Sequence, residues 1–223
     1  MKHYFFGICL TFCGLACSPD VEIAQDKVQA TLTAFGQQNT ENLAVIHTDL
    51  GDMEVRLFDD TPLHRANFVR MTKAGYFEHG IFYRIVENFM VQGGSSDNSK
   101  KPIFRIPNEM SAGHLHLRGA LAMARYDEGN PNLESSASEF YLVQGRRFVM
   151  EDLLLKNSQN HTPEQLHLFE TQGGAPSLDG RYTVFGEITK GLEVLDKMAD
   201  IKVYDGDKPL EKVTFWVEMK AKQ

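Results

Sequence analysis

The sequence predicts an antiparallel β barrel or β sandwich that carries two helices. Two observations support this prediction: short segments of strand-like residues recur along the chain, and turn-forming residues separate them. The 223 residues are 42% hydrophobic, 10% aromatic and 24% charged, which is typical of a folded soluble domain and excludes disorder of the whole chain.

The first two strands are predicted to pair as a hairpin. Residues 45–48 fit a short strand, and the turn-forming residues Asp49, Gly51 and Asp52 follow them. Residues 53–57 alternate between apolar and charged side chains, which is typical of a half-buried strand. Further strands are predicted at residues 81–86, 89–92, 119–123, 140–143, 182–188 and 213–217.

Two helices and one long insertion interrupt the strands. Thr61 supplies a capping hydroxyl, Pro62 suits the first helical position, and Gly75 ends this helix. A second helix is predicted at residues 192–198. Residues 145–176 have little β character and contain a capping-box pattern, Thr-Pro-Glu-Gln, which predicts a helical insertion in a loop.

Charge and hydropathy argue against two classes of protein. The chain has 23 basic and 30 acidic residues, a net charge of −7, so nothing offsets repulsion from the phosphates of a nucleic acid. It contains no run of about 18 apolar residues, so we expect no bilayer-spanning helix in the mature chain.

The amino terminus predicts export. Residues 1–16 have the layout of a secretory signal peptide, and Ala16-Cys17 resembles the lipobox of bacterial lipoproteins, in which the cysteine becomes the lipid-modified first residue. All three cysteines lie within the first 17 residues, so cleavage before Cys17 leaves a single cysteine. Lipid attachment would explain why this one cysteine is present. The alternative is simple cleavage, which leaves Cys17 as a free thiol. We interpret residues 17–42 as a lipidated tether, with a short helix around 28–35, ahead of a folded domain at 43–223.

The most informative stretch is residues 82–94, Phe-Tyr-Arg-Ile-Val-Glu-Asn-Phe-Met-Val-Gln-Gly-Gly. Arg84 lies in an apolar strand, and Phe89, Met90 and Gln92 follow it. Because alternate residues of a strand share a face, this pattern is compatible with a shallow apolar pocket that has polar groups at its edge. Taken alone, the residues favour the alternative that Arg84 is a charge on the outer face and that Phe89 and Met90 belong to the core.

This stretch resembles the central motif of the cyclophilins, the cyclosporin-binding family of peptidyl-prolyl isomerases. That motif is roughly Phe-His-Arg-Val-Ile, two variable residues, then Phe-Met-Ile-Gln-Gly-Gly. Between about residues 44 and 219, further family-like segments occur in the family's order at 67–69, 119–124, 138–142, 178–180 and 184–186. The resemblance implies an all-β, mainly antiparallel fold: a closed eight-stranded barrel capped by two helices. It also implies isomerisation of Xaa–Pro bonds.

The resemblance assigns a role to each site residue. Arg84 is the implied catalytic residue, because a donor aimed at the nitrogen of the twisted amide binds that state better than the planar one. Gln92 is expected to hydrogen-bond the substrate backbone. The implied substrate-binding residues are Phe89, Met90, Gln92, Ala124, Arg125, Glu139, Phe140, Tyr141, Leu178 and Tyr182. No covalent bond breaks in this reaction, so we expect no cofactor and no metal.

Five residues depart from the family pattern; two of them are Tyr83, which replaces a histidine before Arg84, and Arg125, which replaces an asparagine. Glu139 replaces a glutamine and puts a carboxylate near the groove, where an ion pair with Arg84 would hold the guanidinium away from substrate. Ser177 replaces a tryptophan that donates to cyclosporin, so we expect weak cyclosporin binding. Tyr182 replaces a histidine. We expect activity with an altered preference for the residue before proline.

Other motifs carry weaker predictions. His114-Leu115-His116 is interpreted as a solvated loop, with a metal site as the alternative. The serine-rich residues 135–138 lack the nucleophile-elbow motif of a hydrolase, and the glycine-rich residues 93–96 lack the ending of a phosphate loop.

The leading hypothesis is a monomeric, lipid-anchored prolyl isomerase outside the cytoplasm. Its partners would be proline-containing segments of exported proteins and, through the lipid, a membrane. A catalytically weak, cyclophilin-like binding module is the main alternative, and a structural envelope lipoprotein is the third.

Overall fold

A computed structural model describes residues 21–94, 100–157 and 159–220. Eight strands close into an antiparallel barrel in the order β1-β10-β3-β4-β8-β6-β9-β2. These strands are β1 (Leu43–Thr48), β2 (Gly51–Leu57), β3 (Gly80–Val86), β4 (Met90–Gly93), β6 (Ala120–Met123), β8 (Phe140–Val143), β9 (Val184–Lys190) and β10 (Val213–Lys220). The predicted strands are confirmed, and the barrel forms rather than the sandwich. A separate two-stranded sheet pairs β5 (Arg105–Ile106) with β7 (Ser135–Ser136).

Alternating side chains fill the barrel. Along β8, Phe140 and Leu142 belong to the main core, whereas Tyr141 and Val143 belong to a second cluster on the other face of the strand. The Phe140 ring packs against Phe215, with 5.5 Å between ring centroids. Burying one such side chain stabilises the fold by roughly 1.5–3 kcal/mol, so this alternation fixes which face of each strand is available to a ligand.

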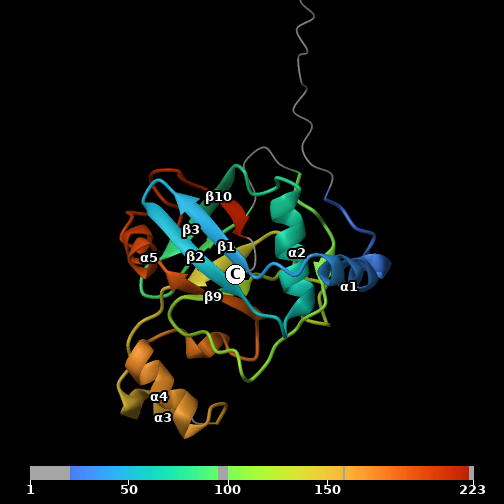
Figure 1. Cartoon of the computed structure of the whole chain (residues 1–223). Helices are drawn as coiled ribbons and strands as arrows, with labels where there is room; N and C mark the ends of the chain where they lie inside the picture. Colours follow the sequence, from blue (N-terminus) through green and yellow to red (C-terminus); the bar gives the residue numbers. More distant parts are fainter. Residues whose placement is uncertain (1–20, 95–99, 158, 221–223) are drawn as a thin grey trace, which may run out of the picture.

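Both predicted helices, α2 (Pro62–Lys73) and α5 (Leu192–Ala199), are present, and they lie on opposite sides of the barrel strands (Figure 1). The capping prediction for α2 is wrong. Thr61 makes no side-chain cap; instead the Glu109 carboxylate accepts hydrogen bonds from the backbone N–H groups of Leu63 and His64, each at 2.9 Å. A carboxylate is favoured there because the amino end of a helix carries partial positive charge, and this one comes from a distant loop.

The tether expected over residues 17–42 must be corrected for residues 21–42. Here a 3-10 turn, η1 (Gln25–Lys27), leads into α1 (Val28–Gln38), which packs against α2. Val28 and Leu32 are buried in the main core, so this segment is part of the folded domain. The α1–α2 contact is close because Gly36 lacks a side chain: a Cβ there would lie 3.1 Å from the Ala66 Cβ. The expected signal peptide and Cys17 lie outside the described residues.

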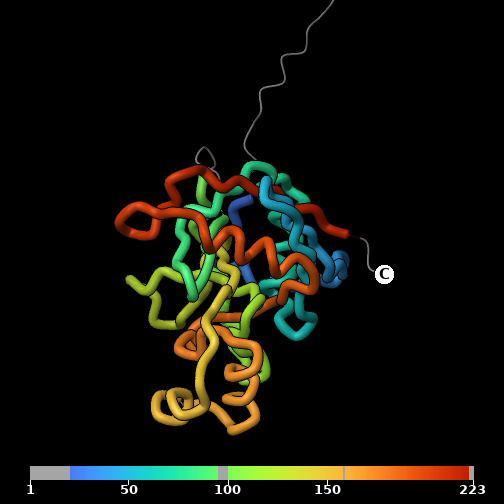
Figure 2. Tube along the Cα trace, turned by 90° about the vertical axis from the view of Figure 1, so that its left-hand side faces the viewer, coloured from blue at the N-terminus to red at the C-terminus, as the bar shows by residue number. Residues whose placement is uncertain are grey.

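The predicted helical insertion is present and extends below the barrel in Figure 2. It contains α3 (Met150–Asn157) and α4 (Pro163–Gln172), and the 3-10 turn η2 (Pro176–Leu178) returns the chain to the barrel. The capping box between Thr162 and Gln165 forms as the pattern indicated. Leu153, Leu166 and Phe169 give the insertion a small core of its own. Among the described helices, none combines the length and apolar character needed to cross a membrane.

Candidate active site

A cavity of about 250 Å³ on the outer face of the barrel brings together nine of the predicted site residues. They are Arg84, Phe89, Met90, Gln92, Ala124, Arg125, Tyr141, Leu178 and Tyr182. The alternative in which Phe89 and Met90 lie in the barrel core is therefore wrong, because both belong to the outer cluster.

Strand register explains how these residues meet. Arg84 of β3 is paired with Gln92 of β4, and Gln92 is in turn paired with Tyr141 of β8. Directly paired residues of neighbouring strands point to the same face. The three side chains therefore form one row across the outside of the barrel, and the apolar residues that follow β3 and β6 complete the cavity around them.

Phe140 does not line this cavity, so its predicted role is corrected. Its side chain is fully buried, and its ring packs edge-on against Phe68 inside the barrel, with centroids 5.7 Å apart. The reason is the two-residue period of a strand: because Tyr141 faces outward, its neighbour Phe140 must face inward. Tyr141 is the aromatic residue of β8 that reaches the cavity.

The carboxylate beside Arg84 is Asp207, not Glu139. The Asp207 Oδ2 atom lies 3.1 Å from both Nε and Nη2 of Arg84. Glu139 is only 4% exposed and is held elsewhere, by Lys101 and by the Tyr126 hydroxyl at 2.7 Å. The expected contact between Glu139 and Arg84 is therefore wrong. Asp207 was missed because its only local signal is a turn-rich sequence, Asp-Gly-Asp, far from the motif.

Glu139 lines a separate cavity of about 250 Å³, together with Lys101 and Tyr126. Tyr83 connects it to the predicted site: its hydroxyl accepts a 2.8 Å hydrogen bond from Gln92 Nε2, and burial together with the Glu139 carboxylate raises the Tyr83 pKa. Tyr83 is therefore a neutral phenol near pH 7. Tyr83 therefore lies between the Glu139 carboxylate, which raises its pKa, and Gln92, which donates a hydrogen bond to it.

A buried hydrogen-bond chain runs from the cavity into the insertion. His116 Nε2 lies 2.9 Å from the Tyr141 hydroxyl, and its Nδ1 lies 2.6 Å from Asp179 Oδ1. Asp179 Oδ2 in turn lies 2.8 Å from His161 Nε2, in the loop between α3 and α4. Since His116 is fully buried, the prediction of a solvated loop is wrong at this residue. Within the described ranges, no group of three or more histidine, cysteine, aspartate or glutamate side chains is arranged to hold a metal ion.

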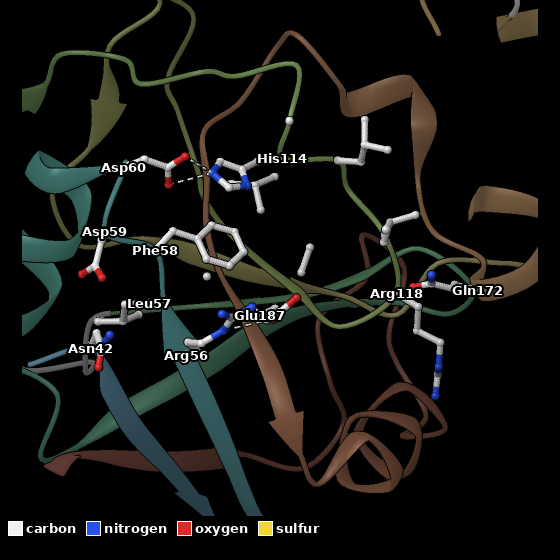
Figure 3. Close-up of a pocket in the computed structure, with 16 residues that line it drawn as sticks. Asn42, Arg56, Leu57, Phe58, Asp59, Asp60, His114, Arg118, Gln172 and Glu187 are labelled. Atoms are coloured by element: carbon white, nitrogen blue, oxygen red, sulfur yellow. Dashed lines mark hydrogen bonds and ion pairs between the residues drawn. The ribbon is translucent and has the colours of Figure 1, made fainter. Parts of the chain in front are cut away.

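A third and larger cavity, about 490 Å³, borders strands β2 and β9 (Figure 3). His114 Nε2 lies 2.8 Å from both carboxylate oxygens of Asp60, and Phe58 stacks on the His114 ring, with centroids 4.2 Å apart. Arg56 pairs with Glu187 beside them. None of the predicted site residues lines this cavity. The candidate active site is therefore the 250 Å³ cavity beside Arg84.

Solved structures share this barrel. A cyclophilin-type peptidyl-prolyl cis-trans isomerase from Cryptosporidium parvum superposes with a TM-score of 0.62 at 20% sequence identity, covering 82% of this chain and 99% of the other. A second crystal structure of that protein, in the presence of the dipeptide Ala-Pro, gives a TM-score of 0.61 at 21% identity, with 81% and 99% covered. The fold is therefore that of the cyclophilins.

Sequence comparison gives the family. The family model described as cyclophilin type peptidyl-prolyl cis-trans isomerase/CLD matches residues 43–216. A putative peptidyl-prolyl cis-trans isomerase of Staphylococcus saprophyticus is 33% identical, with 82% of this chain and 96% of that protein covered. Its counterpart in Staphylococcus epidermidis is 34% identical, with 78% and 88% covered. The chain belongs to the cyclophilin-type peptidyl-prolyl isomerases, and the reaction it catalyses is the cis–trans isomerisation of peptidyl-prolyl bonds.

Proposed function

We propose that Arg84 is the catalytic residue of this isomerase and that the 250 Å³ cavity holds the proline ring. The observation that carries the proposal is the row formed by Arg84, Gln92 and Tyr141, with the guanidinium at its end beside an apolar cavity. Rotation about a peptide bond has a barrier of about 18–20 kcal/mol because resonance holds the amide planar. A catalyst must therefore bind the twisted amide more tightly than the planar one.

Each group around the cavity has a place in this mechanism. Phe89, Met90 and Leu178 offer apolar surface to the proline ring and exclude water from it. The Gln92 side chain reaches the backbone of the substrate. The Arg84 guanidinium donates toward the nitrogen of the twisted amide, whose lone pair is free only when conjugation is lost. This donation stabilises the transition state selectively and raises the rate of the chemical step.

Replacement of Arg84 tests the proposal. A proline-peptide assay coupled to a conformation-selective protease should show that Arg84→Ala lowers kcat/KM about 100-fold or more, as for loss of one transition-state donor elsewhere. Arg56→Ala is the matched control, because Arg56 is also an ion-paired arginine but lines the separate 490 Å³ cavity. Near-parental turnover by folded Arg84→Ala would contradict the proposal. A parent protein without turnover would favour the alternative of a binding module.

We further propose that the isomerase acts outside the cytoplasm as a lipid-anchored monomer, assisting the folding of exported proteins. Support comes from the signal-peptide layout of residues 1–16 and the lipobox-like Ala16-Cys17. A thioether-linked lipid with several acyl chains would anchor the chain firmly, since each buried methylene contributes about 0.8 kcal/mol. Cys17→Ala is expected to move the protein from the membrane to the soluble fraction. Unchanged fractionation would contradict the anchor.

A further inference from the structure

The chain between α5 and β10 forms a short hairpin next to the cavity. Val203 and Pro209 form an antiparallel bridge, Tyr204 N–H donates to Lys208 O at 2.7 Å, and Leu210 N–H donates to Lys202 O at 2.9 Å. Asp207 lies at the tip of this hairpin, with φ of 67°. Asparagine and aspartate are enriched at such positive φ values among residues other than glycine.

The hairpin tip is fixed to the strand that carries Arg84. Asp207 O accepts a 2.8 Å hydrogen bond from the N–H of Ile85, the residue next to Arg84. This backbone contact places the Asp207 carboxylate against the Nε edge of the guanidinium, where Oδ2 accepts from both Nε and Nη2 at 3.1 Å. Asp207 is therefore joined to this strand twice, once through the backbone N–H of Ile85 and once through the side chain of Arg84.

We propose that Asp207 is a positioning residue for Arg84, a role that rests on the proposed catalytic function of Arg84. The Arg84 side chain is 44% exposed, so the cavity walls alone leave it free to change rotamer. An arginine carries about 2 kcal/mol of rotamer entropy, and ordering it before substrate binds removes that cost from the reaction. The carboxylate holds the Nε–Nη2 edge and leaves Nη1 available to the substrate amide.

The opposite role, a clamp that keeps Arg84 away from substrate, makes the opposite prediction. A positioning residue raises turnover, so its loss slows the enzyme. A clamp inhibits, so its loss speeds the enzyme. The two are separated by the sign of the change in kcat/KM.

Asp207→Asn is the sharpest test, because asparagine tolerates positive φ and removes only the charge and one acceptor. We expect kcat/KM for a proline peptide to fall on the order of tenfold, mainly through kcat, because the lost ordering acts on the transition state. Asp205→Asn is the matched control, since Asp205 is an exposed carboxylate in the same hairpin. The unfolding midpoint should stay within the parental range in both variants.

An NMR readout reports on position directly. In the parent protein, the Arg84 Nε–H signal should be resolved and protected from exchange with water, and Asp207→Asn should shift it and speed its exchange. A parental Nε–H signal that exchanges as fast as that of a free arginine overturns the inference even if the variant fails to fold. Unchanged or increased kcat/KM in folded Asp207→Asn overturns it as well.

The two single variants distinguish failure of the positioning role from failure of the proposed function, and a double variant tests whether Asp207 acts through Arg84. If Arg84→Ala abolishes turnover and Asp207→Asn has no effect, only the positioning role fails. If Arg84→Ala retains turnover, the proposed function of Arg84 fails. In the Arg84→Ala background, adding Asp207→Asn should cause no further loss, because Asp207 acts through Arg84.

Discussion

His161 Nε2 lies 2.8 Å from Asp179 Oδ2, and this contact joins the helical insertion to the rim of the candidate active site. Asp179 directly follows Leu178, which lines the cavity, and its other oxygen contacts His116. The His161 side chain is only 3% exposed. The insertion is therefore attached to the segment that forms one wall of the cavity.

We expect His161→Ala to destabilise the protein by about 1–3 kcal/mol, because the Asp179 carboxylate loses a buried hydrogen-bond partner. The loosened Leu178 wall should raise KM for proline peptides more than it lowers kcat. Urea unfolding and steady-state assays measure the two effects. His167→Ala is the control, because the His167 side chain is 67% exposed on α4. Equal effects from the two variants would contradict the anchoring role of His161.

Glu139→Gln should change selectivity more than rate, because Glu139 contacts Lys101 and Tyr126 rather than Arg84. We expect kcat/KM for one reference peptide to change less than about threefold, while the ranking of residues before proline changes. Burial and the bond to Glu139 raise the Tyr126 pKa to about 12. In Glu139→Gln this pKa should fall part of the way toward 10, as followed by ultraviolet titration against a Tyr126→Phe blank. A Tyr126 pKa that stays at about 12 would show that burial alone sets it.

Stability should decrease in acid through Glu41. A hydrogen bond from Lys73 lowers the pKa of the Glu41 carboxyl below its ordinary value. A group with a lowered folded-state pKa stabilises the fold above its unfolded-state pKa, and this stabilisation disappears as pH falls through the folded value. The free energy of unfolding should therefore fall below about pH 4.3, and Glu41→Gln should lack this part of the decline. Parallel pH profiles for the two proteins would refute the assignment.

Gly94→Ala should be severely destabilising, because a Cβ there would lie 2.2 Å from the Ser138 carbonyl oxygen at φ of 155°. We expect a loss of about 2–4 kcal/mol. Gly129→Ala is the matched control: its φ is also positive, at 60°, but no heavy atom lies within 4 Å of the added methyl group. The control should lose only about 1–2 kcal/mol, from backbone strain. Thermal or urea unfolding measures the difference, which combines the close contact with Ser138 and the greater backbone strain at φ of 155° than at 60°.

Local pattern was sufficient for most elements of the fold. The alternation in residues 53–57 indicated β2, and the capping box at Thr162 indicated α4, because both signals depend on neighbours in sequence. The tether was wrong over residues 21–42 because the burial of Leu32 depends on α2 and the core, which the local sequence does not reveal. The prediction that Thr61 caps α2 was wrong for the same reason, because the carboxylate that caps this helix comes from Glu109, far along the chain.

The site, like the fold, was predicted in part from the sequence and decided in part by the tertiary structure. The motif and its family resemblance named Arg84, Gln92 and Tyr141, and strand register then placed them in one row. A two-residue period states that Phe140 and Tyr141 face opposite sides of a strand, but it does not state which side is the interior.

By itself, then, the sequence determined the strands and the main helices, because periodicity and turn chemistry act over a few residues. The family resemblance of its motifs named the residues of the site. Only the tertiary structure decided which groups contact them. It turned Phe140 inward, paired Glu139 with Lys101, and brought Asp207 to Arg84 across 123 positions of the chain. Such contacts depend on how the whole barrel closes, and a carboxylate in a turn carries no local mark of the guanidinium it will meet.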